Sequence, residues 1–317
     1  MGINITDEYK QIVDALEKNG YDASKYFDKR VASIIISGNR VIGLNNVPGV
    51  KLTPTQIENG VRVDMEIEEG VALPIPIHVC TGYVEKRGLQ NIIFNIRIRK
   101  NAKVKFTSHC VFPQVEEFTH NAISNVIVED GAVMEYADEH FHSDLGTINL
   151  RTITNAKVEK GGIYKNSFTL TKTRIGKLYV EMNLDLGESA IGELTSKVKG
   201  TKNDEIEIKE TLNLNGERSR GIAKSTVVAL DETKANIVNI AYGNAPYSYG
   251  HVECNEITKG NKVDVKTEPI LKVVNDLSEL THEASIGRVN RRQLETLMAK
   301  GLTEEEATEL IIKGILQ

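Results

Sequence analysis

Tryptophan is absent from this chain of 317 residues, and aromatic residues make up only 5% of it. Its three cysteines, Cys80, Cys110 and Cys254, stand far apart with no Cys-x-x-Cys spacing, which excludes a disulfide framework and a self-contained zinc ribbon. No apolar run approaches the roughly 20 residues that span a bilayer, and the first residues lack the pattern of a signal peptide. We therefore expect a cytoplasmic protein without a membrane span.

Several common function classes also lack their sequence signals. The net charge is −5, which argues against nucleic-acid binding because phosphate contacts need clustered Lys and Arg. Gly176-Lys177 is followed by Leu178 and has no glycine five positions earlier, so the chain has no phosphate-binding loop. Dinucleotide-binding, serine-hydrolase and zinc-protease motifs are missing too. The sequence gives no local signal for an enzyme of these classes.

The middle of the chain is rich in short β-branched runs. Val, Ile and Thr recur from about Ile57 to Val274 and are interrupted by Gly, Asn and Asp, as in many short strands. A turn residue followed by Ala recurs there, in phrases such as NAKV and GAVM; the alanines are Ala102, Ala132, Ala156, Ala190 and Ala235. This loose period favours a β-solenoid, although a β-sandwich also fits short strands. We expect a mainly β fold.

Both ends of the chain show helical patterns. Asp7 to Lys18 carries apolar residues at helical spacing, and near the other end Asn290 is a helix cap while Thr303 with Glu306 is a capping box. The second pattern predicts a helical hairpin that either caps the solenoid or docks a partner. The expected segments are 1–56 with a short helix, 57–275 with the β core and 276–317 with the helical hairpin.

Four residues in the first half are candidate metal ligands. His140 and His142 form a His-x-His that on a strand places both imidazoles on one face, and Cys110 and His120 lie in the segment SHCVFPQVEEFTH. Such residues can build a metal site on a β scaffold. The alternative is that the histidines are buried and satisfied by backbone carbonyls while Cys110 acts as a small hydrophobe.

A second candidate site lies near the C-terminus. Cys254 precedes the pair His282-Glu283 by about a strand length, and together they offer the thiolate, imidazole and carboxylate that hold iron or zinc. The alternatives are an inert buried thiol, whose pKa the neighbouring Glu253 and Glu256 raise, and a salt-bridged His-Glu pair. These residues alone leave the function undecided.

The phrases GHVECNEI from Gly250 and THEASIGRVNRRQLETLMAKGL from Thr281 resemble, in order and spacing, the C-terminal signature of the SufB/SufD family of iron–sulfur cluster assembly proteins. SHCVFP with Thr119-His120 resembles, less tightly, a further phrase of the family. The resemblance implies a right-handed parallel β-helix between smaller helical regions. It also implies pairing through the β-helices and binding of SufC, an ABC-type ATPase, through the C-terminal helices. ATP would then be hydrolysed by that partner, so the chain itself is expected not to be an enzyme.

By the same resemblance, Cys254 corresponds to the cysteine implicated in cluster formation, and His282 and Glu283 to the pair beside it. The expected function is a scaffold on which an iron–sulfur cluster is assembled and passed on, as a homodimer or a SufB/SufD-type heterodimer, with a sulfur donor and acceptor proteins as further partners. The alternative is a structural subunit that only organises the ATPase and a cluster-bearing paralogue. A sugar-binding solenoid is disfavoured because no aromatic platform stands out.

Overall fold

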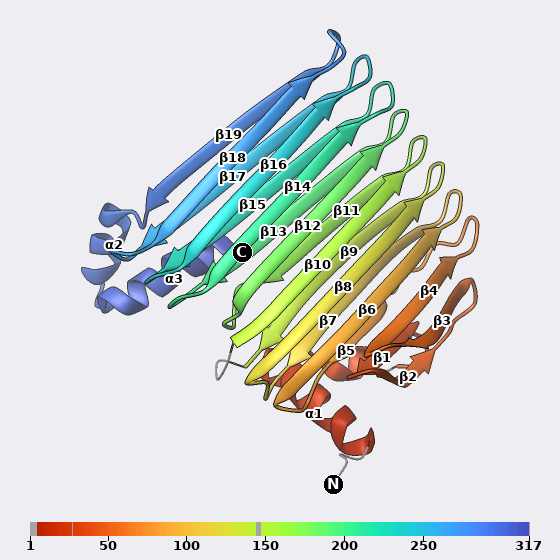
Figure 1. The fold of residues 1–317 in the computed structure, drawn as a ribbon, viewed down its shortest axis with the longest axis horizontal. Coiled ribbons are helices and arrows are strands. Elements are labelled where there is room, and N and C mark those ends of the chain that lie inside the picture. The colour runs from red at the N-terminus through yellow and green to blue at the C-terminus, as the bar shows by residue number, and fades with distance from the viewer. Residues whose placement is uncertain (1–4, 27, 144–146, 317) are drawn as a thin grey trace.

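The computed structural model describes residues 5–26, 28–143 and 147–316, and these form a solenoid of two long β-sheets (Figure 1). The first sheet contains, in spatial order, β19 (Glu279–Arg288), β17 (Tyr249–Lys259), β15 (Arg220–Leu230), β13 (Ile191–Gly200), β11 (Ile163–Leu170), β9 (Val133–His142), β7 (Lys103–Phe112), β5 (Ile77–Gly82), β1 (Ser33–Ser37) and β2 (Arg40–Asn45). The second contains β18 (Asp264–Val273), β16 (Lys234–Gly243), β14 (Glu205–Leu214), β12 (Gly176–Leu186), β10 (Thr147–Val158), β8 (Glu117–Val128), β6 (Arg87–Ile98), β4 (Gly60–Ile67) and β3 (Val50–Ile57).

From β4 onward, successive strands alternate between the two sheets, so that each coil contributes one strand to each sheet. Within the described residues, the strand pairs of the coils are parallel, and the antiparallel pairs are β1 with β2 and β3 with β4. Leu, Ile and Val side chains from both sheets fill the interior. The predicted mainly β solenoid is therefore confirmed, because a sandwich would need antiparallel neighbours.

The recurring alanine occupies two different positions in the coil. Ala102, Ala132 and Ala190 are fully buried at tight turns, each after a residue with a positive φ, and each donates its N–H to the carbonyl three residues earlier. Ala156 and Ala235 instead face the interior from strands β10 and β16. The alanine phrase thus mixes turn and strand positions, which explains its uneven intervals.

An asparagine ladder runs along the outside of the second sheet and stacks the coils in register. The side-chain amide of Asn95 donates to Asp64 on the preceding coil at 2.7 Å, and Asn125, Asn155 and Asn183 each donate to the asparagine before them at 3.0, 3.4 and 3.2 Å. The spacing of 28 to 31 residues along this ladder measures one coil. The ladder was not recognised in the sequence.

Helices lie at both ends of the solenoid, as predicted. α1 (Ile5–Lys18) packs Ile12 and Leu16 against the outer face of the first sheet, next to Cys80. α2 (Arg291–Met298) is capped by Asn290, and α3 (Glu304–Leu316) begins at the expected capping box, in which Glu306 N–H donates to Thr303 Oγ1. No helix within the described ranges is both long and apolar enough to cross a bilayer.

The strands reach beyond the expected β core on both sides. β1 and β2 lie within 1–56, and β19 lies within 276–317, so His282 and Glu283 belong to a strand of the last coil. β19 pairs in parallel with β17 but most of its side chains are exposed. A strand that is not covered on either face lacks the alternation of apolar and polar residues that marks a half-buried strand in a sequence.

Candidate metal sites

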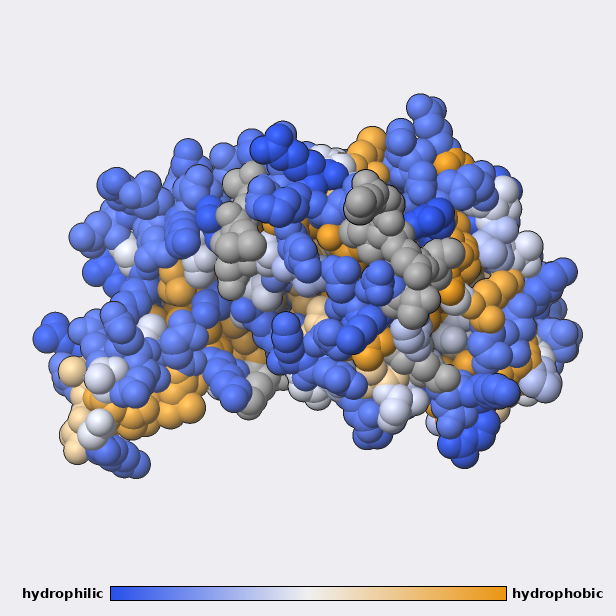
Figure 2. Space-filling view, turned by 90° about the horizontal axis from the view of Figure 1, so that it is seen from below, coloured by the Kyte–Doolittle hydropathy of each residue, from blue (hydrophilic) through white to orange (hydrophobic). Residues whose placement is uncertain are grey.

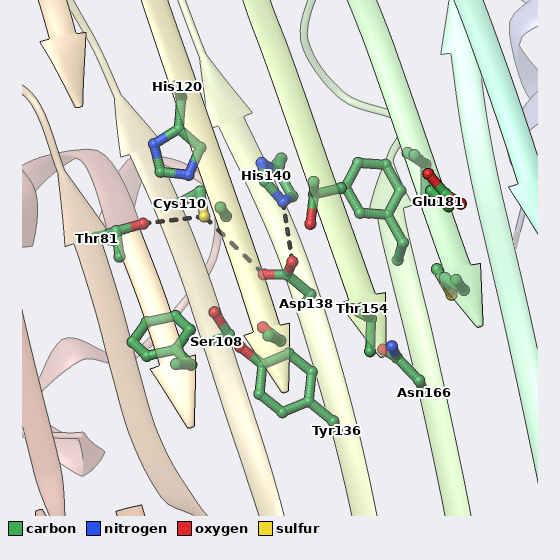
Figure 3. A pocket seen from close by; sticks show the side chains of 17 residues that line it. Thr81, Ser108, Cys110, His120, Tyr136, Asp138, His140, Thr154, Asn166 and Glu181 are labelled. Atoms are coloured by element: carbon green, nitrogen blue, oxygen red, sulfur yellow. Dashed lines mark hydrogen bonds and ion pairs between the residues drawn. The ribbon is translucent and has the colours of Figure 1, made fainter. Parts of the chain in front are cut away.

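Three potential metal ligands meet inside the first half of the solenoid. Cys110 on β7 and Asp138 and His140 on β9 have ligand atoms that all lie within 4.8 Å of one another (Figure 3). Cys110 Sγ is 4.0 Å from Asp138 Oδ1, and His140 Nε2 is 3.1 Å from Asp138 Oδ2. Thr81 Oγ1 donates a hydrogen bond of 3.0 Å to the sulfur. We call Cys110, Asp138 and His140 the Cys110 group.

Strand alternation puts this group together. Every second residue of β9 faces the interior, so Asp138, His140 and His142 point the same way. The two histidines are therefore on one face and buried, as expected of a His-x-His on a strand. Asp138 was missed in the sequence, although the alternation in Asp-x-His-x-His extends one step back to it.

Burial controls the protonation of these side chains. Burial raises the pKa of the Cys110 thiol well above its ordinary value, and the neighbouring Asp138 raises it further. Burial also acts to raise the pKa of Asp138, but His140 and a hydrogen bond from Ser108 outweigh it and hold this pKa below its usual value. Asp138 is therefore a carboxylate at neutral pH, and a cation is the ligand that would offset its buried charge.

The other two candidate histidines border the group without joining it. His120 Nδ1 is 2.9 Å from Gln90 Oε1, while His142 stacks on Phe112 with ring centroids 5.1 Å apart. Among the described residues, His120 Nε2 is buried and has no hydrogen-bond partner. Burial lowers the pKa of His120 to about 3 and that of His142 well below its ordinary value, so both are neutral imidazoles that resist protonation and have lone pairs suited to a metal.

A small cavity lies between these side chains. Its volume is about 20 Å³, and Cys110, His120, Asp138 and His140 are among the residues that line it. This is room for about one water molecule or a single metal ion. The cavity beside the Cys110 group could therefore hold one ion, and its volume is too small for a cluster.

The structure places Cys254 and His282 on the same face of the first sheet. Cys254 on β17 is 1% exposed and points into the solenoid, and Val252 also points inward. His282 on β19 is in register with Val252, so it lies on this inner face, two positions along from Cys254. Glu283 is in register with Glu253 and lies on the outer face. Strand register thus separates Glu283 from the other two predicted ligands within one chain.

Cys254 lies one coil from the open end of the solenoid. Its strand is covered by β19, whose residues His282 and Ala284 are exposed to solvent. Burial raises the pKa of the Cys254 thiol, against a smaller opposing effect of hydroxyls from Thr267 and Ser225. Within the described part of the chain, only the Cys110 group brings three ligand atoms within 4.8 Å, so the Cys254 site has fewer close ligands than the Cys110 group.

Two buried glutamates share the interior with Cys254. Glu210 on β14 accepts hydrogen bonds from Ser196 Oγ at 2.6 Å and Asn239 Nδ2 at 2.7 Å. Glu256 on β17 is 1% exposed, and its two carboxyl oxygens accept no hydrogen bond from another described residue. Burial raises the pKa of both carboxyl groups to about 7. Glu210 was missed in the sequence, although it stands at an inward position of the alternating segment EIEIKETLNL.

An apolar layer separates the buried polar residues around the Cys110 group from those around Cys254. Phe168 and Leu170 of β11 and Val180 and Met182 of β12 are almost fully buried in the coil between them. The Cys110 group lies on the N-terminal side of this layer, and Cys254 lies on the C-terminal side. The interior therefore holds two distinct candidate sites.

Comparison with protein families matches residues 83–315 to the model described as SUF system FeS cluster assembly, SufBD core domain. This range includes every residue of the Cys110 group as well as Cys254, His282 and Glu283. The match therefore covers both candidate sites, α2 and nearly all of α3.

Similar proteins occur in archaea and bacteria. An iron–sulfur cluster assembly SufBD family protein of Pyrococcus horikoshii is 52% identical over 316 residues, which is 99% of this chain and 95% of that protein. One of Methanocaldococcus jannaschii is 35% identical over 99% of both chains. The iron–sulfur cluster assembly protein SufB of Bacillus subtilis is 39% identical over 67 residues, which is 21% of this chain and 14% of that protein.

Proposed function

Because this chain belongs to the SufBD family, which takes part in iron–sulfur cluster assembly, we propose that it is a scaffold on which a cluster is built and then passed to acceptor proteins. The observation that carries this proposal is the position of Cys254 and His282 on one inner face beside the open end of the solenoid. His282 is exposed at that end and lies within reach of a donor and an acceptor, while Cys254 behind it is 1% exposed.

The chemistry of the Cys254 site fits iron and sulfide as substrates. The thiolate of Cys254 can attack the outer sulfur of a donor persulfide, which forms a new S–S bond on Cys254 and releases the donor as a thiolate. The same sulfur ligates iron, and the His282 imidazole is a second ligand. Glu283 lies on the outer face. There its carboxylate can bind iron before the iron enters the site, or it can be a ligand in a site shared with a second subunit.

The last coil supports a dimer with a second copy of this chain. β18 and β19 are the edge strands of their sheets at this end, and unpaired edges favour association. Around them Val273, Val274 and Leu277 are 52%, 59% and 51% exposed, and Ile286 is 51% exposed. A second copy would cover this apolar surface and, by two-fold symmetry, would double the ligands near Cys254.

The helical hairpin supports docking of a SufC-like ABC ATPase. α3 is tied to the solenoid by Lys199, which contacts Glu309 at 3.0 Å, and by Lys259, which donates to Thr308 Oγ1 at 2.9 Å. Met298 and Leu310 remain 41% and 49% exposed, and Figure 2 shows apolar side chains gathered at the left end of that view, the end at which α2 and α3 lie. A fixed helix pair with exposed apolar residues is suited to a partner, and that partner would hydrolyse the ATP.

One observation favours the alternative of a structural subunit. Cys254 is almost fully buried and its pKa is raised, which is also true of an inert core cysteine. The test is anaerobic reconstitution of the purified chain with ferrous iron and sulfide. A scaffold gains a brown chromophore with visible sulfide-to-iron absorption and bound iron and sulfide in comparable amounts, while a structural subunit stays colourless after desalting.

A further inference from the structure

We infer that Glu256 supplies the internal carboxylate ligand for a divalent transition-metal ion at Cys254, an inference that rests on the proposed function of that site. The two residues stand at successive inward positions of β17, with Asn255 between them pointing outward. Side chains two residues apart on a strand share a face and are neighbours. Glu256 is therefore the carboxylate of this chain that lies on the same strand and the same face as Cys254.

The carboxyl group of Glu256 has no hydrogen-bond partner on another residue that the structure describes. Both of its oxygens are buried, and the residue is 1% exposed. Glu210 shows the contrast, because each of its two oxygens accepts a hydrogen bond, one from Ser196 and one from Asn239. A buried polar group left unpaired destabilises the fold, and a bound cation is the kind of ligand that removes this cost.

The inner face around Cys254 offers a further donor type for ferrous iron, although the ligand atoms of Cys254, His282 and Glu256 are not all within 4.8 Å of one another in the described structure. On the paired strand β19, the inner face carries His282, Ala284 and Ile286, in register with Val252, Cys254 and Glu256 in that order. Along the strands, Cys254 is thus one inward position from the residue paired with His282 and one inward position from Glu256. Thiolate, imidazole and carboxylate are the donors that first-row divalent metals accept together, and His282 on the last coil is exposed to solvent.

Cobalt(II) titration under anaerobic conditions tests this inference. A cobalt–thiolate bond gives a charge-transfer absorption band, which reports metal binding at the thiolate independently of iron content and activity. The titration is done in the Cys110→Ala background, which removes the thiol of the Cys110 group. Glu256→Gln is expected to weaken cobalt binding at least tenfold while leaving the fold intact, since the amide has the same shape and removes a buried charge. The matched control, Glu253→Gln on the outer face of β17, where Glu253 pairs with Lys224, is expected to change the affinity less than twofold.

The outcomes separate this inference from the proposed function. If the band disappears in Cys254→Ala but Glu256→Gln binds cobalt as tightly as the parent, Glu256 is not a ligand and the inference is overturned while the Cys254 site stands. If the parent itself shows no thiolate band, both the Cys254 site and the role of Glu256 are wrong. Loss of affinity in Glu256→Gln with an unchanged thermal unfolding curve supports the inference.

Discussion

Cys110 on β7 and His140 on β9 occupy directly paired positions of the first sheet, and both side chains point into the solenoid. Asp138, one inward position before His140, contacts both of them. A thiol, a carboxylate and an imidazole are thus held together by strand pairing alone, with their spacing set by the sheet. This buried group lies apart from Cys254, so its metal binding can be tested separately.

Asp138→Asn should weaken cobalt binding at the Cys110 group about tenfold or more, because it removes the negative charge that stabilises a cation there. The measurement is a cobalt titration in the Cys254→Ala background, which leaves Cys110 as the interior thiol. Glu135→Gln is the matched control, since Glu135 lies on the same strand but faces outward and pairs with Lys105 at 2.7 Å. Equal affinity of Asp138→Asn and Glu135→Gln would show that Asp138 is not a ligand.

Glu210→Gln should flatten the pH dependence of stability. The pKa of Glu210 is about 7 in the folded chain against 4.5 for an ordinary Glu, so the folded state binds more protons than the unfolded state between these values. This contribution to the free energy of unfolding is present below pH 4.5 and is lost as the pH rises through 7, by up to about 3 kcal/mol. Urea unfolding at pH 5 and pH 8 should show a smaller difference in the variant, and an unchanged difference would contradict the assignment.

Leu310→Glu should weaken binding of a SufC-like ATPase at least tenfold, because it places a charge on the exposed apolar face of α3. Leu44→Glu on β2 is the matched control, since Leu44 is 45% exposed and Leu310 is 49% exposed. Binding is measured by pull-down and calorimetry with the intact chain. If both variants bind the ATPase equally well, the docking surface lies elsewhere.

Val274→Asp should shift the proposed dimer toward monomer, with a dissociation constant raised at least tenfold, because it charges the apolar surface beside β18. Ile191→Asp on β13 serves as control, since this residue is similarly exposed at 43% but lies far from the last coil. Analytical ultracentrifugation over a range of concentrations gives the dimer dissociation constants of the two variants. A dimer that is unaffected by Val274→Asp but lost in Ile191→Asp would place the interface on the side of the solenoid.

Much of the fold could be predicted because short β-branched runs, turn residues and helix caps are local signals. Asn290 and the Thr303–Glu306 capping box mark the terminal helices as expected. The asparagine ladder could not be found in this way, since its hydrogen bonds join residues about 30 positions apart and nothing local distinguishes Asn125 from other exposed asparagines.

The candidate sites were predicted in part for the same reason. His140 and His142 share a face because alternation is a property of one strand, and the same rule applied to Asp138 and Glu210 would have identified both as inward residues. The relation of Glu283 to Cys254 depends on the register between β17 and β19, which is fixed by pairing across a whole coil. Because His282 and Glu283 are adjacent in sequence, the motif suggests that they act at one site. On strand β19, however, their side chains point to opposite faces of the sheet.

The central claim is that Cys254 holds the nascent cluster, and anaerobic reconstitution of two matched variants tests it most directly. Cys254→Ala removes an inward thiol beside the open end, whereas Cys80→Ala removes an equally buried thiol that packs outside the first sheet against α1. The account predicts that Cys80→Ala keeps the iron and sulfide content of the unaltered chain and that Cys254→Ala loses most of both while remaining folded. Equal iron and sulfide contents in the two variants would contradict it.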